Sequence, residues 1–187
     1  MFVELNGGEI LVEITVSGPP GSGTSTLVEK LAHEYSWASI NGGDVFRNEA
    51  NNRGLTVGQF SDLCKSDLEV DKSLDNMLKN EIGNPLGAEI IESRLSGWWA
   101  YLMDVDCLRV WVNVSPEECA RRIQNREGGL YEDKLILSQQ RQIDDKKRYQ
   151  ILYDIDLDDM SPYSLIIDAD NIGADEVLSI VQSKIRK

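Results

Sequence analysis

Apolar residues follow two alternating patterns along this chain. Short runs rich in β-branched residues recur between longer segments whose apolar positions are spaced three or four residues apart. The short runs predict buried strands, and the longer segments predict helices with one apolar face. We expect strands at residues 10–16, 38–40, 88–92, 108–114 and 164–169, with a short flanking strand at 2–5. We expect helices at residues 24–35, 44–52, 56–65, 68–81, 116–127, 132–153 and 174–186.

Because strands and helices alternate, we expect a parallel sheet covered on both faces by helices. The expected fold class is α/β, with a five-stranded parallel sheet. A length of 187 residues suits one domain with small inserts, and it permits a substantial core without disulfides. The sequence contains no internal repeat and no linker long enough to separate two domains.

Polar and glycine residues mark several of the predicted helix ends. Asp44 precedes a helical segment, and we expect its carboxylate to cap the N-terminus of that helix. Ser115 is followed by Pro116 and two acids, which is a typical helix start. Gly128 and Gly129 are expected to end that helix.

Composition limits the possible partners. The chain has 32 acidic and 19 basic residues, for a formal net charge of −13, and such a surface repels nucleic acids and anionic membranes. The cysteines, Cys64, Cys107 and Cys119, form no metal-binding or disulfide pattern, and we expect reduced, mostly buried thiols. The only histidine, His33, is expected on a helix surface. We therefore expect a cytoplasmic monomer with neither nucleic acid nor membrane as a partner.

A glycine-rich segment follows the first predicted strand and opens the first long helix. Gly18 and Gly23 hold the glycine positions of the phosphate-binding pattern GxxxxGK[ST], and Ser25 holds its final hydroxyl position. Glycine lets backbone N–H groups crowd around a phosphate, a helix N-terminus attracts the anion, and the hydroxyl ligates Mg²⁺. The pattern predicts a P-loop NTPase-type sheet, and an ordinary glycine-rich turn is the alternative. The residues expected at the nucleotide phosphates are Gly18, Pro19, Pro20, Gly21, Ser22, Gly23, Thr24, Ser25 and Thr26.

One position of this loop departs from the pattern. Thr24 stands where the pattern has a lysine, whose charge normally reaches the β- and γ-phosphates. Loss of that charge leaves two possibilities open. Either another cation replaces the lysine, or the loop binds phosphate without efficient transfer.

Positive charge is concentrated in one segment of the acidic chain. Residues 121–148 hold eight basic and five acidic side chains. Arg122 and Arg126 share a helix face at a spacing of four, and Arg141 and Arg148 share one at a spacing of seven. Phosphoryl transfer needs cations around the moving group, so arginines on both sides of a glycine hinge suit a closing lid. The alternative is a solvated helix whose bases pair with neighbouring acids.

Two further polar groups follow predicted strands. Asp44 and Arg47 are three residues apart at a helix start and suit a polar ligand, with Arg47 pairing to phosphate. A helix cap beside a surface arginine is the alternative. Glu92 and Arg94 lie where a strand ends, and ligands of parallel sheets gather at the carboxyl ends of strands. They are candidates for contact with a metal-bound water and with substrate. The two tryptophans that follow are expected to pack in the core.

The ordered motifs of the chain are Gly18-Pro-Pro-Gly-Ser-Gly23, Gly43-Asp-Val-Phe-Arg47, Glu92-Ser-Arg-Leu-Ser-Gly-Trp98, Arg122-Ile-Gln-Asn-Arg126-Glu, Arg148-Tyr149 and Tyr153-Asp-Ile-Asp156. Together, over about residues 10–182, they resemble the archaeal-type cytidylate kinases among the nucleoside monophosphate kinases. The resemblance implies ATP-dependent phosphorylation of the nucleotides CMP or dCMP, with Mg²⁺ as cofactor.

The resemblance also implies an organisation and a set of roles. A core formed by residues 10–43, 82–127 and 154–187 would carry a monophosphate-binding insert at 44–81 and a lid region at 128–141. The implied substrate-binding residues are Asp44, Arg47, Asp71, Asp75 and Arg94. The implied ATP and Mg²⁺ contacts beyond the loop are Arg122 for ATP and, for the metal, Ser25 and Glu92. The arginines implied around the transferring phosphoryl group are Arg126, Arg141 and Arg148.

Two alternatives stay open on the sequence alone. The first is a kinase of the same fold that acts on AMP or on a small metabolite. The second is a nucleotide-binding module without catalysis, which the threonine at position 24 favours.

Overall fold

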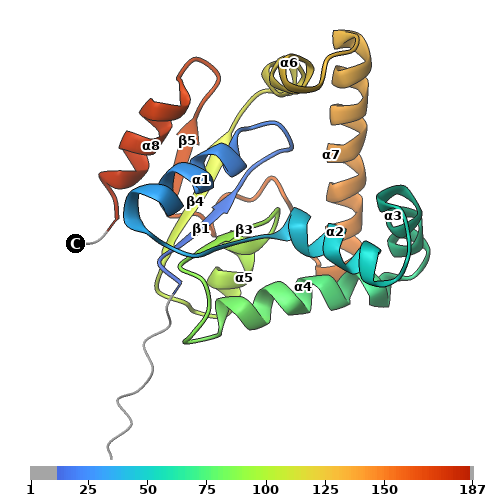
Figure 1. Cartoon of the computed structure of the whole chain (residues 1–187), viewed down its shortest axis with the longest axis horizontal. Coiled ribbons are helices and arrows are strands. Elements are labelled where there is room, and N and C mark those ends of the chain that lie inside the picture. The colour runs from blue at the N-terminus through green and yellow to red at the C-terminus, as the bar shows by residue number, and fades with distance from the viewer. Residues whose placement is uncertain (1–11, 186–187) are drawn as a thin grey trace, which may run out of the picture.

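A computed structural model of the chain describes residues 12–185, apart from the side chains of Lys65 and Asp71. Its strands form one parallel sheet in the order β2-β3-β1-β4-β5, flanked by helices (Figure 1). The strands are β1 (Ile14–Ser17), β2 (Ser39–Asn41), β3 (Ile90–Glu92), β4 (Leu108–Asn113) and β5 (Leu165–Asp168). The helices are α1 (Thr24–Tyr35), α2 (Gly42–Asn52), α3 (Val57–Ser66), α4 (Leu68–Ile82), α5 (Ser96–Leu102), α6 (Pro116–Glu127), α7 (Tyr131–Tyr153) and α8 (Ala174–Gln182). The predicted α/β class with five parallel strands is confirmed.

Apolar periodicity located the elements well. Each predicted strand and helix within residues 12–185 is present, with ends shifted by a few residues. The predicted strand at 2–5 and the first two residues of the strand at 10–16 lie outside the described residues. Helix α5 was not predicted. Its seven residues are too few to show a helical period, and its packing is set by the core.

Two hydrophobic cores lie on opposite faces of the sheet. On one face, α1 and α8 pack against strand residues, with Leu27, Leu31 and Val181 nearly inaccessible to solvent. On the other face, α5 inserts the buried Trp98 and Trp99, which confirms their expected place in the core. A Cβ on Gly97 of α5 would lie 2.3 Å from Tyr163 Cε1, so this close approach requires glycine.

The segment between β2 and β3 forms a helical insert, α2 to α4, that stands beside the sheet below α7 (Figure 1). The insert has a small core of its own, formed by Ala50, Phe60, Cys64 and Leu74. Helix α7 returns from the far end of the molecule, and its last turns join the main core through Tyr149 and Tyr153. The insert and α7 therefore both border the carboxyl edge of the sheet.

One predicted helix cap is wrong and two helix ends are confirmed. Asp44 is not the N-cap of α2, because the helix begins earlier and Asn41 caps it by accepting hydrogen bonds from Gly43 N and Asp44 N. Asn41 sits one residue before the helix, where a side-chain oxygen can accept from the first free amides, whereas Asp44 already lies within the first turn. Ser115 caps α6 through Glu118 N, and Gly128 ends it with φ of +71°.

The cysteines and the histidine lie as expected. Cys64 and Cys119 are buried, Cys107 is half-buried, and none of the three forms a disulfide. Burial raises the pKa of Cys107 and of Cys119 to about 11, so both remain protonated and unreactive near neutral pH. His33 is exposed on α1. Within residues 12–185, no helix combines the length and the apolar character that crossing a bilayer requires.

Candidate active site

The loop between β1 and α1 has the shape of a phosphate cradle. Gly21 and Gly23 have φ of +91° and +95°, values that side chains rarely tolerate. A Cβ on Gly18 would lie 2.6 Å from Ser22 Oγ and 2.8 Å from Val112 O. Gly23 is the N-cap of α1 and has no side chain, so it leaves the first N–H groups of the helix available to an anion.

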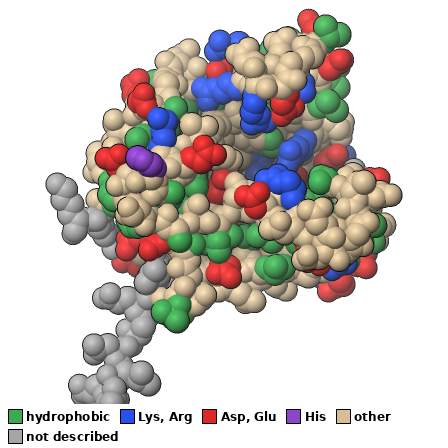
Figure 2. All heavy atoms as spheres, in the orientation of Figure 1, with side chains coloured by type: hydrophobic (Ala, Val, Ile, Leu, Met, Phe, Trp, Pro, Cys, Tyr) green, Lys and Arg blue, Asp and Glu red, His purple; other side chains and the backbone are tan. Residues whose placement is uncertain are grey.

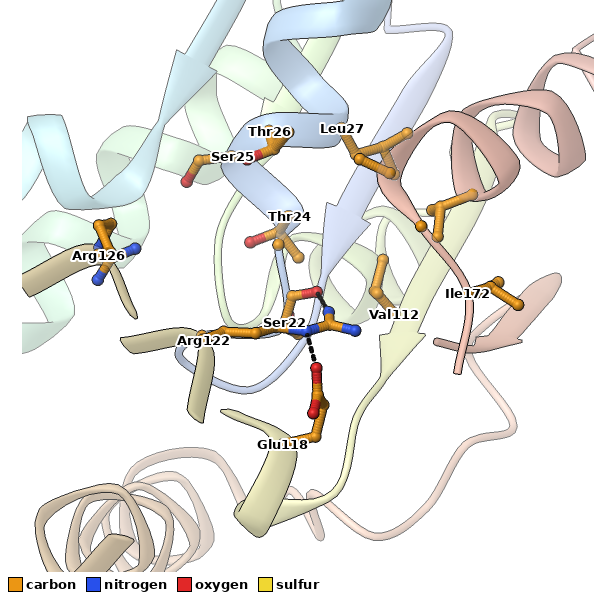
Figure 3. A pocket seen from close by; sticks show the side chains of 15 residues that line it. Ser22, Thr24, Ser25, Thr26, Leu27, Val112, Glu118, Arg122, Arg126 and Ile172 are labelled. Carbon is orange, nitrogen blue, oxygen red and sulfur yellow. Dashed lines mark hydrogen bonds and ion pairs between the residues drawn. The ribbon is translucent and has the colours of Figure 1, made fainter. Parts of the chain in front are cut away.

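The cradle opens into a cleft of about 460 Å³, a volume suited to a small-molecule ligand (Figure 3). The loop and the first turn of α1, residues 21–27, form its polar floor. Arg122 and Arg126 approach from α6, and the start of α8 adds an apolar wall that includes Ile172 and Val177. The cleft thus joins a phosphate-binding end to an apolar end, as a nucleotide requires.

Ser25 and Glu92 meet beside the cradle. Ser25 Oγ donates a hydrogen bond of 3.0 Å to Glu92 Oε1. Glu92 ends β3, where it is paired with Val16 of β1. The residue is 7% exposed, and burial raises the pKa of its carboxyl group above the ordinary value. Hydrogen bonds from neutral side chains, those of Thr24, Ser25 and Asn41, offset part of this rise.

This pair fits a divalent cation. Mg²⁺ prefers oxygen ligands and is usually held by one or two carboxylates, several waters and the phosphates of the substrate. Ser25 Oγ and the Glu92 carboxylate supply such oxygens at the end of the phosphate loop. The donor set therefore suits a Mg²⁺ ion that the protein shares with nucleotide phosphates.

Arg122 is fastened against the phosphate loop. Its Nη1 donates to Ser22 O at 2.8 Å, and its Nε donates to Glu118 Oε1 at 2.7 Å (Figure 3). Its Nη2 donates to Ala169 O. Each of the three guanidinium nitrogens thus donates a hydrogen bond, and the side chain is only partly exposed. A fixed positive charge thus lies at the loop that lacks a lysine at position 24.

Arg126, one turn further along α6, is held more loosely. Its side chain is 69% exposed and pairs with Glu127 at 2.6 Å. Hydrogen bonds from Lys134 and then Arg126 lower the pKa of Glu127 to about 2, so this acid stays charged near neutral pH. Figure 2 shows blue Lys and Arg side chains along the hollow of this face of an otherwise acidic protein.

Arg94 belongs to a second and more buried group of charges. Its Nε lies 3.7 Å from Asp145 Oδ2, and Arg148 Nη2 lies 3.1 Å from Asp145 Oδ1. The guanidinium of Arg94 also stacks 5.3 Å from the ring centroid of Trp111. Its Nε and Nη1 are buried and make no hydrogen bond to the described residues, so these donors are available to an oxyanion.

The predicted substrate-binding residues of the insert differ in their exposure and in their partners. Asp44 and Arg47 form an exposed ion pair of 2.7 Å on the first turns of α2. Asp75 is 9% exposed and accepts a hydrogen bond of 2.7 Å from Tyr153 Oη, which ties α4 to the end of α7. Asp71 lies on α4, and its side chain is outside the described set.

The predicted arginines are not all brought together. Arg122 and Arg126 line the cleft, whereas Arg141 and Arg148 do not appear among its described lining residues. Arg141 is exposed on α7. Arg148 donates to Tyr149 Oη at 2.6 Å and pairs with Asp145. In this conformation the phosphate cleft therefore has two of the four predicted cations.

Three polar residues of the site were not predicted from the sequence. Asn41 donates to Glu92, Glu118 anchors Arg122, and Asp145 lies between Arg94 and Arg148. Glu118 and Asp145 precede an arginine by four and three residues, a spacing that predicts a helical ion pair. Asn41 is of a residue type that is favoured at the N-cap of a helix, and this preference could have identified it.

The parallel sheet, the glycine loop between its first strand and helix, and the hydroxyl–carboxylate pair at its carboxyl edge define a P-loop nucleotide-binding protein. In agreement, residues 17–136 match the family model described as an AAA domain.

The comparisons with curated proteins are more specific. The chain is 36% identical to the cytidylate kinase of Halobacterium salinarum over 168 residues, which covers 90% of this chain and 86% of that protein. It is also 36% identical to the cytidylate kinase of Archaeoglobus fulgidus over 173 residues, covering 91% and 92% of the two chains. The protein belongs to the cytidylate kinase family.

A solved structure supports the fold. The shikimate kinase from Bacteroides thetaiotaomicron is 16% identical, has a TM-score of 0.59, and covers 92% of this chain and 97% of its own. At this identity the similarity concerns the fold alone. The family assignment rests on the curated relatives.

Proposed function

We propose that this protein transfers the γ-phosphoryl group of ATP to CMP or dCMP. The observation that carries the proposal is a glycine cradle that opens into a nucleotide-sized cleft and meets the Ser25–Glu92 pair, in a chain of the cytidylate kinase family. The core would bind ATP, the insert at 44–81 would bind the acceptor monophosphate, and the lid region at 128–141 would close over both.

The donor nucleotide binds in the cleft. Backbone N–H groups of the loop surround its phosphates, and the apolar wall at the start of α8 packs against its base or sugar. Arg122 supplies positive charge beside the loop in place of the lysine absent at position 24. Ser25 and, through water, Glu92 would hold Mg²⁺, which would supply positive charge to neutralise the phosphates.

The acceptor monophosphate binds on the other side of Glu92. Arg94 has two buried nitrogen atoms that make no hydrogen bond to the described residues, although its Nε lies in the ion pair with Asp145, and Arg47 is on an exposed turn of α2. Asp44 would accept a hydrogen bond from the same nucleotide, while Asp71 and Asp75 would lie near its base. The attacking oxygen belongs to a phosphate that is already ionised, so the reaction needs no general base.

The remaining arginines stabilise the charge that develops during transfer. Arg126 is already in the cleft, and Arg141 and Arg148 would reach the phosphoryl group when the lid region closes. Gly128 and Gly129, with φ of +71° and +91°, separate α6 from α7 and suit a hinge. Closure would exclude water and so limit the hydrolysis of ATP.

A coupled assay of ADP formation with CMP, dCMP, UMP and AMP tests the proposal. We expect the largest kcat/KM with CMP or dCMP, and no turnover when EDTA replaces Mg²⁺. A preference for AMP would favour the alternative kinase, and absence of ADP with every acceptor would refute catalysis. ATP binding in calorimetry without any turnover would then identify a nucleotide-binding module.

The expected monomer and its cytoplasmic location are part of the proposal. The net charge of −13 supports the absence of nucleic acid and membrane partners. Size-exclusion chromatography with light scattering checks the monomer, which has a mass of 21.0 kDa.

A further inference from the structure

Asn41 connects the start of α2 with Glu92. It ends β2, where the sheet register pairs it with Glu92 of β3. Its Oδ1 accepts hydrogen bonds from Gly43 N at 2.7 Å and Asp44 N at 3.2 Å, which caps α2. Its Nδ2 donates to Glu92 Oε2. One amide group thus joins the start of the acceptor-side helix to the carboxylate beside the phosphate loop.

The two ends of this amide are not interchangeable. A flip would place the Asn41 NH₂ group against the N–H donors of Gly43 and Asp44, and the carbonyl oxygen against the Glu92 carboxylate. Both new contacts would be repulsive, because donors would face donors and acceptors would face acceptors. The cap therefore fixes the direction in which Nδ2 points.

Glu92 is held from both sides as a result. Oε1 accepts from Ser25 Oγ at 3.0 Å, and Oε2 accepts from Asn41 Nδ2. Ser25 lies on α1 and Asn41 at the end of β2, so the plane of the carboxylate is set by two separate elements. A nearly buried carboxylate with both oxygens engaged has little freedom to rotate.

We propose that Asn41 is a positioning residue, which fixes the orientation in which Glu92 serves Mg²⁺ and couples it to the N-terminus of α2. This inference rests on the proposed function, in which Glu92 acts on the metal through water. Removal of an outer partner that orients the groups around a bound metal typically lowers metal affinity by about 10- to 100-fold. The expected effect is therefore specific to metal and leaves nucleotide binding as such unchanged.

Three variants separate this role from helix capping. Asn41→Ser keeps an oxygen that caps α2 but lacks the Nδ2 donor to Glu92. Asn41→Ala lacks both. Thr56→Ala is the matched control, because Thr56 caps α3 within the same insert and has no described contact with Glu92.

The measurement is the calorimetric affinity for ADP, with EDTA and with Mg²⁺, on the full chain. The ratio of the two dissociation constants is the gain that the metal provides. We expect both Asn41 variants to lower this gain by about 10-fold or more, with unchanged affinity for ADP in EDTA. Thr56→Ala should keep the full gain. Asn41→Ala and Thr56→Ala should each lower Tm by about 2–4 °C, whereas Asn41→Ser should not.

Three results would overturn the inference. One is a metal-dependent gain in Asn41→Ser equal to that of the wild type, and another is an equal loss of ADP affinity with and without Mg²⁺. A wild-type protein that gains nothing from Mg²⁺ would overturn it as well. Failure of the proposed function is a different result, namely no phosphorylation of CMP or dCMP, and the ADP titrations do not depend on turnover.

Discussion

The phosphate loop and the arginine-bearing helices, α6 and α7, differ in how they are prepared for the anion binding proposed above. The loop follows a fully buried strand and is shaped by backbone conformation, with two glycines at positive φ. The arginines instead rely on side chains that are held by acids, as in the pairs Arg126–Glu127 and Arg148–Asp145. The loop already has the shape of a phosphate cradle, whereas the arginines would have to exchange their acidic partners for phosphate in the proposed reaction.

An exposed arginine can leave its acidic partner at a small cost in free energy. An exposed ion pair stabilises a protein by only about 0–1 kcal/mol, so a phosphate competes easily with Glu127 for Arg126. The pair Arg94–Asp145 is less exposed, at 12% and 11%, and its acid contacts two arginines. Acidic partners thus hold the arginine side chains in position when no nucleotide is bound, and the more buried pairs hold them more strongly. Four predictions test this comparison, from the largest expected effect to the smallest.

The first concerns Arg126, the loosely held arginine in the cleft. An arginine that stabilises transferring phosphoryl charge contributes about 10³-fold or more to kcat, so Arg126→Ala should lower kcat with ATP and CMP by about that factor. Arg121→Ala is the control, because Arg121 is 62% exposed on the same helix and pairs with Glu118. Equal losses in both variants would show that the helix needs charge in general and not Arg126 in particular.

The second concerns Asp145, the buried acid between two arginines. Asp145→Ala leaves Arg94 and Arg148 without their shared partner, and loss of one member of a buried pair costs about 3 kcal/mol. Urea denaturation should show this loss in the free energy of unfolding. The adjacent, exposed Asp144 accepts a hydrogen bond of 2.8 Å from Gln140, and Asp144→Ala should change stability by less than about 0.5 kcal/mol. Similar values for the two variants would contradict the distinction by burial.

The third concerns the packing of the loop. Gly18→Ala places a methyl group 2.8 Å from Val112 O, a backbone atom that cannot move aside, and overpacking of this kind costs about 1–3 kcal/mol. Gly58→Ala, on α3, meets nothing within 4 Å and should raise stability by up to about 1 kcal/mol. Thermal unfolding of both variants measures the difference. A neutral Gly18→Ala would mean that the cradle adapts more than its geometry indicates.

The fourth concerns the position without lysine. Thr24→Lys should raise kcat by less than about tenfold, a difference of about 1.4 kcal/mol, because Arg122 already brings a fixed charge to the loop. Thr24→Met controls for side-chain length without charge. A larger gain would show that Arg122 does not replace the lysine, and the coupled assay with CMP decides between the two.

The sequence predicted those parts of the site that depend on local conformation. Gly18, Gly23 and Ser25 predict a phosphate loop because backbone geometry restricts which residues fit each position. The helix ends at Ser115 and Gly128 follow from the same local rules, and the apolar period located the long helices. Asp44 was wrongly assigned as a cap because the helix begins two residues earlier than predicted, at Gly42, which makes Asn41 the residue before it.

The amino-acid sequence by itself thus determined the α/β fold, the phosphate loop and the set of arginines available to it. Only the tertiary structure decided which of these side chains meet. Ser25 and Asn41 reach Glu92 across 67 and 51 residues of chain, and Asp145 meets Arg94 through the return of α7 to the sheet. Such contacts depend on the order of strands and on the path of a long helix, which no local pattern encodes.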